Sequence, residues 1–128
     1  MKTTDTTELA YIGDAVYEVF IRTYVLENMP GRINIMNRNV INFVKANSQA
    51  KAMKLMLEED FLSEKEVMLF KRARNHTNTN HPRGVSPMAY KMATGFEALV
   101  GYFYVNEDKQ RLEEFILKSI DLIGGKDE

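Results

Sequence analysis

The sequence contains no cysteine, so disulfide bonds and cysteine-based zinc sites are excluded. No apolar run approaches the roughly 20 residues of a membrane-spanning helix, and the N-terminus, MKTTDTTELA, lacks the apolar core of a secretion signal. We therefore expect a soluble, cytoplasmic protein with no membrane partner. With 128 residues, 45% of them hydrophobic, the chain has the size of one folded domain, which we expect to span residues 1–128.

Acidic residues are missing from two long stretches, residues 28–57 and 67–96. Ten of the 17 basic residues lie in these stretches, although the net charge of the whole chain is only -1. Such segregation can give a nearly neutral protein one strongly positive face. The pattern favours an anionic partner such as nucleic acid, although ordinary solvated helix faces would show the same composition.

Strand-like alternation is also absent, whereas helical spacing recurs along the chain. We expect an all-α helical bundle with no sheet. The predicted helices cover residues 8–28, 33–57 (as one helix or two), 63–74, 88–105 and 108–123, and the polar segment 75–87 between the third and fourth is a predicted loop. Thr6 or Thr7 is the expected cap of the first helix, and Ser63 with Glu66 forms a capping box for the third. The predicted apolar face of the first helix consists of Leu9, Ile12, Val16, Val19, Phe20 and Thr23.

Two of these helices carry a carboxylate in apolar surroundings. Asp14 lies within LAYIGDAVYEVF, and Glu97 lies within TGFEALVGYF. Glycines at positions Gly13, Gly95 and Gly101 flank the two acids, although glycine destabilises a helix by about 1 kcal/mol relative to alanine. If the helices cross at these glycines, the two carboxylates meet and can share a divalent cation. Solvated acids, or acids paired with basic side chains, are alternatives that the residues alone leave open.

Four segments resemble a known family. LAYIGDAVYEVFIR and KMATGFEALVGYFYV resemble the two signature helices of the ribonuclease III catalytic domain. KANSQAKAM and FKRARNHTNTNHPRGVSPMAYK are similar to segments of its short, single-domain branch, Mini-ribonuclease III. The resemblance covers about residues 9–120 and implies an all-α endonuclease that acts as a homodimer. It also implies cleavage of double-stranded RNA with Mg²⁺, which Mn²⁺ can replace, leaving a 5′-phosphate and a 3′-hydroxyl.

The resemblance also implies roles for individual residues. Asp14 and Glu97 match the signature aspartate and glutamate of the family, which makes them the implied catalytic and metal-binding residues. Glu18 matches an acidic position with a supporting role. Two further carboxylates of the full-length enzymes are replaced here by Ala10 and Thr94, which leaves the number of bound metal ions open.

Longer relatives carry a double-stranded-RNA-binding domain, which we do not expect here, so the catalytic domain itself must hold RNA. The implied substrate is a precursor of the large-subunit (23S) ribosomal RNA. A non-catalytic RNA-binding or ribosome-associated helical module is the main alternative, and a protein-interaction domain without RNA affinity is another. The candidate RNA-binding residues are Arg72, Arg74, Asn75, His76 and Arg83, with Asn78 and Asn80 as further hydrogen-bond donors.

Overall fold

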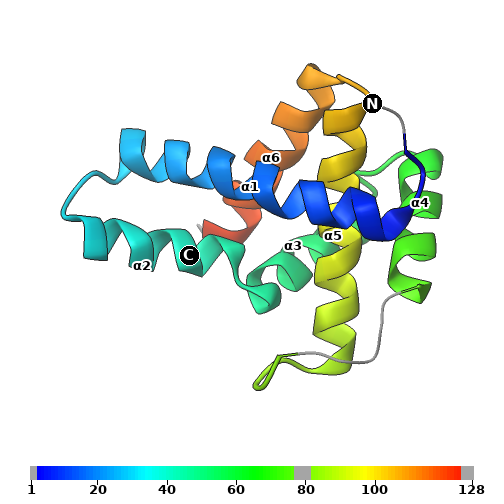
Figure 1. Ribbon diagram of the computed structural model, residues 1–128, viewed down its shortest axis with the longest axis horizontal. Helices are drawn as coiled ribbons and strands as arrows, with labels where there is room; N and C mark the ends of the chain where they lie inside the picture. Colours follow the sequence, from blue (N-terminus) through cyan, green and yellow to red (C-terminus); the bar gives the residue numbers. More distant parts are fainter. Residues whose placement is uncertain (1–2, 77–81, 125–128) are drawn as a thin grey trace.

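The computed structural model describes residues 3–76 and 82–124. These residues form six helices and no strand, which confirms the all-α prediction. Figure 1 shows α1 crossing α5 at a steep angle, with α2 running back alongside α1. Within the described ranges, no helix combines the length and apolar character that a membrane span requires. The helices are α1 (Thr6–Asn28), α2 (Ile33–Val44), α3 (Ala46–Glu58), α4 (Glu64–Asn75), α5 (Pro87–Val105) and α6 (Lys109–Gly124).

The cap of α1 differs from the prediction. Asp5 caps the helix, because its Oδ1 accepts hydrogen bonds from the backbone N–H groups of Thr7 and Glu8 at 2.9 and 3.1 Å. Thr6 is already helical and buried, so its side chain belongs to the packing of α1 and not to its cap. The prediction of a threonine cap was therefore wrong, and aspartate is a cap of at least equal strength.

The predicted apolar face of α1 was wrong in its second half. Val19 and Phe20 are 64% and 38% exposed, and Thr23 is exposed as well. The reason is that α2 folds back along the opposite side of α1, where the hydroxyl of Tyr17 donates a hydrogen bond to the carbonyl oxygen of Phe43 at 3.1 Å. The buried face runs through Leu9, Ala10, Gly13, Val16, Tyr17, Ile21 and Val25.

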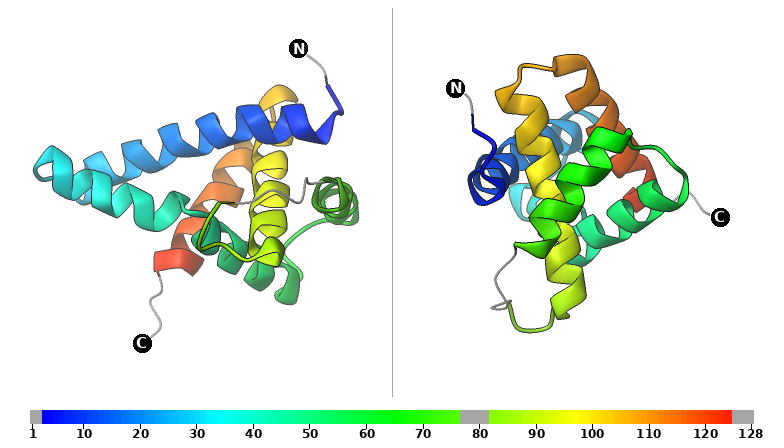
Figure 2. Two further views of the ribbon diagram at one scale, coloured as in Figure 1. Left: turned by 60° about the horizontal axis from the view of Figure 1, so that its bottom comes forward. Right: turned by 90° about the vertical axis from the view of Figure 1, so that its right-hand side faces the viewer.

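The stretch between residues 33 and 58 forms two helices. Lys45 separates α2 from α3 in an extended conformation, with φ of -67° and ψ of 154°. The hydroxyl of Ser48 donates to the carbonyl oxygen of Asn42 at 2.5 Å and joins the two helices across this break. The change of direction brings α3 against α5, as the two views in Figure 2 show. The buried face of α3 is thereby placed beside the centre of α5.

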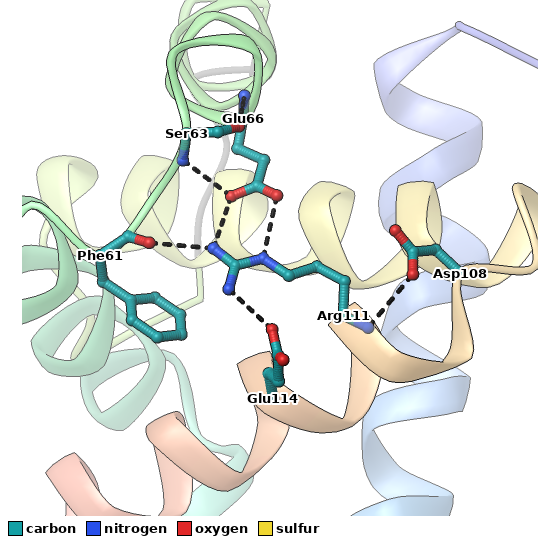
Figure 3. A network of polar contacts seen from close by, with 6 residues as sticks. All are labelled: Phe61, Ser63, Glu66, Asp108, Arg111 and Glu114. Atoms are coloured by element: carbon teal, nitrogen blue, oxygen red, sulfur yellow. Dashed lines mark hydrogen bonds and ion pairs between the residues drawn. The ribbon is translucent and has the colours of Figure 1, made fainter.

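The capping box of α4 is confirmed and is part of a larger polar network. The hydroxyl of Ser63 accepts from the N–H of Glu66 at 3.2 Å, and Oε1 of Glu66 accepts from the N–H of Ser63 at 3.0 Å. Arg111 of α6 donates two hydrogen bonds to the same carboxylate, at 2.8 and 3.0 Å, and one to the carbonyl oxygen of Phe61 at 2.9 Å (Figure 3). Burial alone would raise the pKa of Glu66, but the hydrogen bonds from Arg111 and Ser63 outweigh it and lower the pKa. The network fixes α4 to α6.

Candidate active site: a carboxylate pair at a helix crossing

The backbones of α1 and α5 touch where the two helices cross. A Cβ atom at Gly13 would lie 1.9 Å from the carbonyl oxygen of Glu97, and one at Gly101 would lie 1.9 Å from the carbonyl oxygen of Leu9. No side chain fits at such distances, so the crossing requires glycine at both positions. The prediction that the two helices cross at glycines is therefore confirmed for Gly13 and Gly101.

Three further residues near the two acids, at positions 10, 94 and 95, have other roles in the fold. A Cβ atom at Gly95 would lie 2.4 Å from the ring of Phe70, so this glycine makes room for α4 and not for α1. Thr94 donates its hydroxyl to the carbonyl oxygen of Tyr90 at 3.0 Å, within its own helix. Ala10 is buried in the core. Positions 10 and 94 therefore supply packing and a hydroxyl group, and no carboxylate.

The close crossing brings the carboxylates of Asp14 and Glu97 together. Asp14 is exposed, whereas Glu97 is half-buried. Burial raises the pKa of Glu97 to about 8, and the negative charge and hydrogen-bonding contact of Asp14 contribute to this rise. Two acids in contact repel each other when both are ionised, so the pair requires either a shared proton or a cation.

The donors at this crossing suit a hard divalent cation. Mg²⁺ prefers oxygen ligands and is commonly held by one or two carboxylates, with water completing its shell. In the described part of the chain, no third acidic, histidine or cysteine side chain joins Asp14 and Glu97. Glu18, the predicted supporting acid, accepts a hydrogen bond of 2.9 Å from Nε of Arg22, one turn further along α1. A cation here would therefore have two carboxylate ligands, and water or substrate would supply the rest.

A residue that the sequence reasoning missed lies beside the pair. Gln49 of α3 is 1% exposed, and its amide lowers the pKa of Glu97. Neither amide atom forms a hydrogen bond of acceptable geometry with any other described residue. The sequence holds one signal for it, since helical spacing places Gln49 on the same face as Ala52, Met53 and Met56, which are all buried.

Two of the predicted RNA-binding arginines lie in the last turn of α4 and contact the protein itself. Arg72 donates to the carbonyl oxygen of Thr4 at 3.0 Å. Arg74 donates to Oδ1 of Asn75 at 3.3 Å, and its guanidinium carbon lies 5.5 Å from the ring centre of Phe70. In both arginines it is the guanidinium group that makes these contacts.

The other predicted RNA-binding residues are exposed. Asn75 ends α4, His76 follows it, and Arg83 lies in the turn before α5. The end of α4 and the start of α5 lie on the same side of the α1–α5 crossing (Figure 2, right). Asn78 and Asn80 lie outside the described residues.

Comparison with known proteins identifies the family. Residues 7–108, which include both carboxylates, match the ribonuclease III domain. Mini-ribonuclease 3 of Enterococcus faecalis is 38% identical over 120 residues, which cover 94% of this chain and 91% of that protein. Mini-ribonuclease 3 of Clostridium tetani is 42% identical over 115 residues, which cover 89% of this chain and 75% of that protein. A crystal structure of a Fusobacterium nucleatum protein matches with a TM-score of 0.79 and 32% identity over 90% of both chains. The chain thus belongs to the Mini-ribonuclease 3 branch of the ribonuclease III family, a family of endoribonucleases that act on double-stranded RNA.

Proposed function

We propose that this protein is a metal-dependent endoribonuclease in which Asp14 and Glu97 together hold Mg²⁺ or Mn²⁺ and direct the cleavage of double-stranded RNA. The observation that carries the proposal is the contact between these two acids at a helix crossing that only glycine permits. The membership of the Mini-ribonuclease 3 branch supports the same activity.

The two carboxylates differ in environment, and so do their tasks. Asp14 is exposed, so its carboxylate is accessible to a duplex. Glu97 is half-buried with a pKa of about 8, so it retains a proton near neutral pH until a cation replaces that proton. A bound divalent cation supplies stabilisation of the charge that develops on a phosphodiester during hydrolysis, and it favours ionisation of a water molecule. The products are a 5′-phosphate and a 3′-hydroxyl.

The exposed polar residues around the end of α4 and the start of α5 bind the RNA. Proteins recognise A-form RNA mainly through its phosphates and 2′-hydroxyls. Arg83 is exposed and can reach phosphates, and Asn75 and His76 can donate to either group. Arg72 and Arg74 keep their charge near the same end of α4, and Glu18, which accepts a hydrogen bond from Arg22, is the supporting acid.

We further propose that the protein is a single-domain enzyme that acts as a homodimer on a 23S ribosomal RNA precursor in the cytoplasm. One site cuts one strand, so cutting both strands of a duplex requires two sites. Large apolar side chains on the outer face of α1 give a surface that a second copy can cover. Tyr11, Val19 and Leu26 are 82%, 64% and 61% exposed.

The direct test is cleavage of an RNA duplex by the wild type, Asp14→Asn and Glu97→Gln, each with Mg²⁺, with Mn²⁺ or with EDTA. We expect cleavage by the wild type with either metal and none in EDTA. The cleavage rate of each variant should be at least about 100-fold lower than that of the wild type. Mutation of a residue that only supports a metal ligand already lowers metal affinity or activity about 10–100-fold. Glu27→Gln, which removes an exposed acid of α1 away from the crossing, is the matched control and should cleave normally.

Two outcomes would contradict the proposal. Equal cleavage by the wild type and Asp14→Asn would remove Asp14 from the mechanism. RNA binding without metal-dependent cleavage would favour the alternative function, a non-catalytic RNA-binding module.

A further inference from the structure

Gln49 occupies a position where packing gives no reason for an amide. Its side chain lies on the buried face of α3, beside Ala52, Met53 and Met56, which are completely buried. Neither Nε2 nor Oε1 has a hydrogen-bond partner within residues 3–76 and 82–124. A buried amide without partners destabilises a fold, whereas an apolar side chain of the same shape would not. Gln49 therefore destabilises the fold unless another group forms hydrogen bonds with its amide.

The polar end of Gln49 is placed at the carboxylate pair. Helix α3 packs against α5, and the amide of Gln49 lies beside the side chain of Glu97. In the present arrangement the two groups do not meet the geometry of a good hydrogen bond. Ligation of a cation would require the Glu97 carboxylate to take one fixed orientation, and a hydrogen bond from the amide of Gln49 would favour one.

We propose that Gln49 is a positioning residue, which holds one oxygen of Glu97 through Nε2 and leaves the other oxygen for the divalent cation. This inference rests on the proposed function of the site. An ionised carboxylate only accepts hydrogen bonds, so Nε2 is the atom of Gln49 that faces Glu97. Oε1 then needs a donor that the described residues do not supply, and a water molecule at the site meets that need.

The test compares Gln49→Met with Met53→Leu. Methionine has nearly the length and volume of glutamine but no amide, so Gln49→Met removes the proposed hydrogen bonds and keeps the packing. Met53→Leu makes a change of similar size one turn further along the same face of α3. Three properties of each purified full-length protein are measured: Mn²⁺ affinity by electron paramagnetic resonance, the melting temperature in EDTA, and kcat and KM for an RNA duplex as Mg²⁺ is varied.

Gln49→Met should bind Mn²⁺ about tenfold or more weakly, which is the usual effect of losing a group that orients a metal ligand. It should need more Mg²⁺ for half-maximal cleavage, with an unchanged KM for RNA and a melting temperature no lower than that of the wild type. Met53→Leu should leave Mn²⁺ affinity unchanged. In wild-type crystals grown with Mn²⁺, Nε2 should lie about 2.9 Å from an oxygen of Glu97.

Wild-type Mn²⁺ affinity in Gln49→Met, or a lower melting temperature with normal affinity, would assign Gln49 to packing and overturn the inference. An amide of Gln49 that still lacks a partner in the Mn²⁺ crystals would overturn it too, even where the variant fails to fold. In these cases the wild type still cleaves RNA, so the proposed function stands. A wild type that neither binds Mn²⁺ nor cleaves RNA would overturn the proposed function and the role of Gln49 with it.

Discussion

Glu97 couples the stability of the fold to pH. Its pKa is raised from the ordinary value of 4.5 to about 8 by burial and by Asp14. Between these two values, the folded chain keeps a proton that the unfolded chain has released. The proton on Glu97 therefore stabilises the fold fully at pH values below the pKa of the unfolded chain. This stabilisation is lost as the pH rises through the pKa of the folded chain. A cation bound by the pair would replace the proton and restore the stability at the upper end of this range.

We predict that in EDTA the free energy of unfolding falls as the pH rises from about 5 to about 8, with a slope of at most about 1.4 kcal/mol per pH unit from this one group. Glu97→Gln should remove most of the fall, because glutamine does not ionise. Addition of Mn²⁺ at the upper pH should stabilise the wild type and not this variant. Urea denaturation at several pH values measures the effect, with Glu27→Gln as the control, and equal slopes in Glu97→Gln and the wild type would refute it.

The two acids could be found from the sequence, whereas the only signal for Gln49 was its helical spacing with the buried residues of α3. Asp14 and Glu97 stand out because glycines and apolar residues surround them. Gln49 lies in KANSQAKAM, among lysine, asparagine and serine, which is the composition of a solvated helix face. Its burial depends on the break at Lys45 that turns α3 under α5, and no local pattern shows where α3 points after that break.

The crossing of α1 and α5 is the element on which the site depends. Glycine has a low helix propensity, so Gly13 and Gly101 each weaken the helix that contains them. The close packing of the two helix backbones nevertheless requires glycine at both positions. The sequence predicted this crossing because three glycines within two helices needed an explanation. It did not predict the break at Lys45 or the outward position of Val19, since both depend on where α2 docks.

We predict that Gly13→Ala destabilises the protein by about 3 kcal/mol or more, because the new Cβ atom would overlap the backbone of α5. Alanine would gain only about 1 kcal/mol through its higher helix propensity, so the steric term should prevail. Gly31→Ala is the control, since a Cβ atom there meets nothing within 4 Å. Chemical denaturation compares the two, and similar stabilities would show that the backbones of α1 and α5 can move apart freely.

Across the whole molecule, the pair between Glu66 and Arg111 joins α4 to α6 (Figure 3). The two residues are 45 positions apart, so nothing in the sequence linked them. Arg111→Gln should destabilise the fold by about 2 kcal/mol, less than the 3–5 kcal/mol of a fully buried pair because both side chains retain some contact with water. The pKa of Glu66 is lowered in the fold. The pair therefore stabilises the fold at pH values above the pKa that Glu66 has in the unfolded chain, and this stabilisation is lost as the pH falls through its pKa in the folded chain.

The control for this pair is Glu114→Gln, which removes the 3.1 Å contact of Arg111 with a half-exposed carboxylate. It should cost less than about 1 kcal/mol, as exposed ion pairs do. Thermal and urea unfolding at neutral and acidic pH separate the two variants. A loss in Arg111→Gln that does not shrink in acid would show that Glu66 is not the partner that matters.

The segregation of charge predicts how the molecule binds RNA. Arg83→Gln should weaken binding to an RNA duplex. It should also reduce the steepness of log affinity against log salt concentration by about 1, the effect of losing one phosphate contact. Lys109→Gln is the control, because this exposed lysine begins α6, near the opposite end of α5 from Arg83 (Figure 1). Filter binding at several salt concentrations measures both slopes. An unchanged slope in Arg83→Gln would exclude the start of α5 from the RNA-binding surface.

Anomalous diffraction from wild-type crystals soaked in Mn²⁺ would show directly whether Asp14 and Glu97 share a cation. We predict a peak at the crossing of α1 and α5, about 2.1 Å from a carboxylate oxygen of Asp14 and from one of Glu97, the distance typical of small divalent ions. The peak should disappear in crystals of Asp14→Asn. Mn²⁺ bound elsewhere, or carboxylates that stay free of metal while the crystals diffract well, would contradict this prediction.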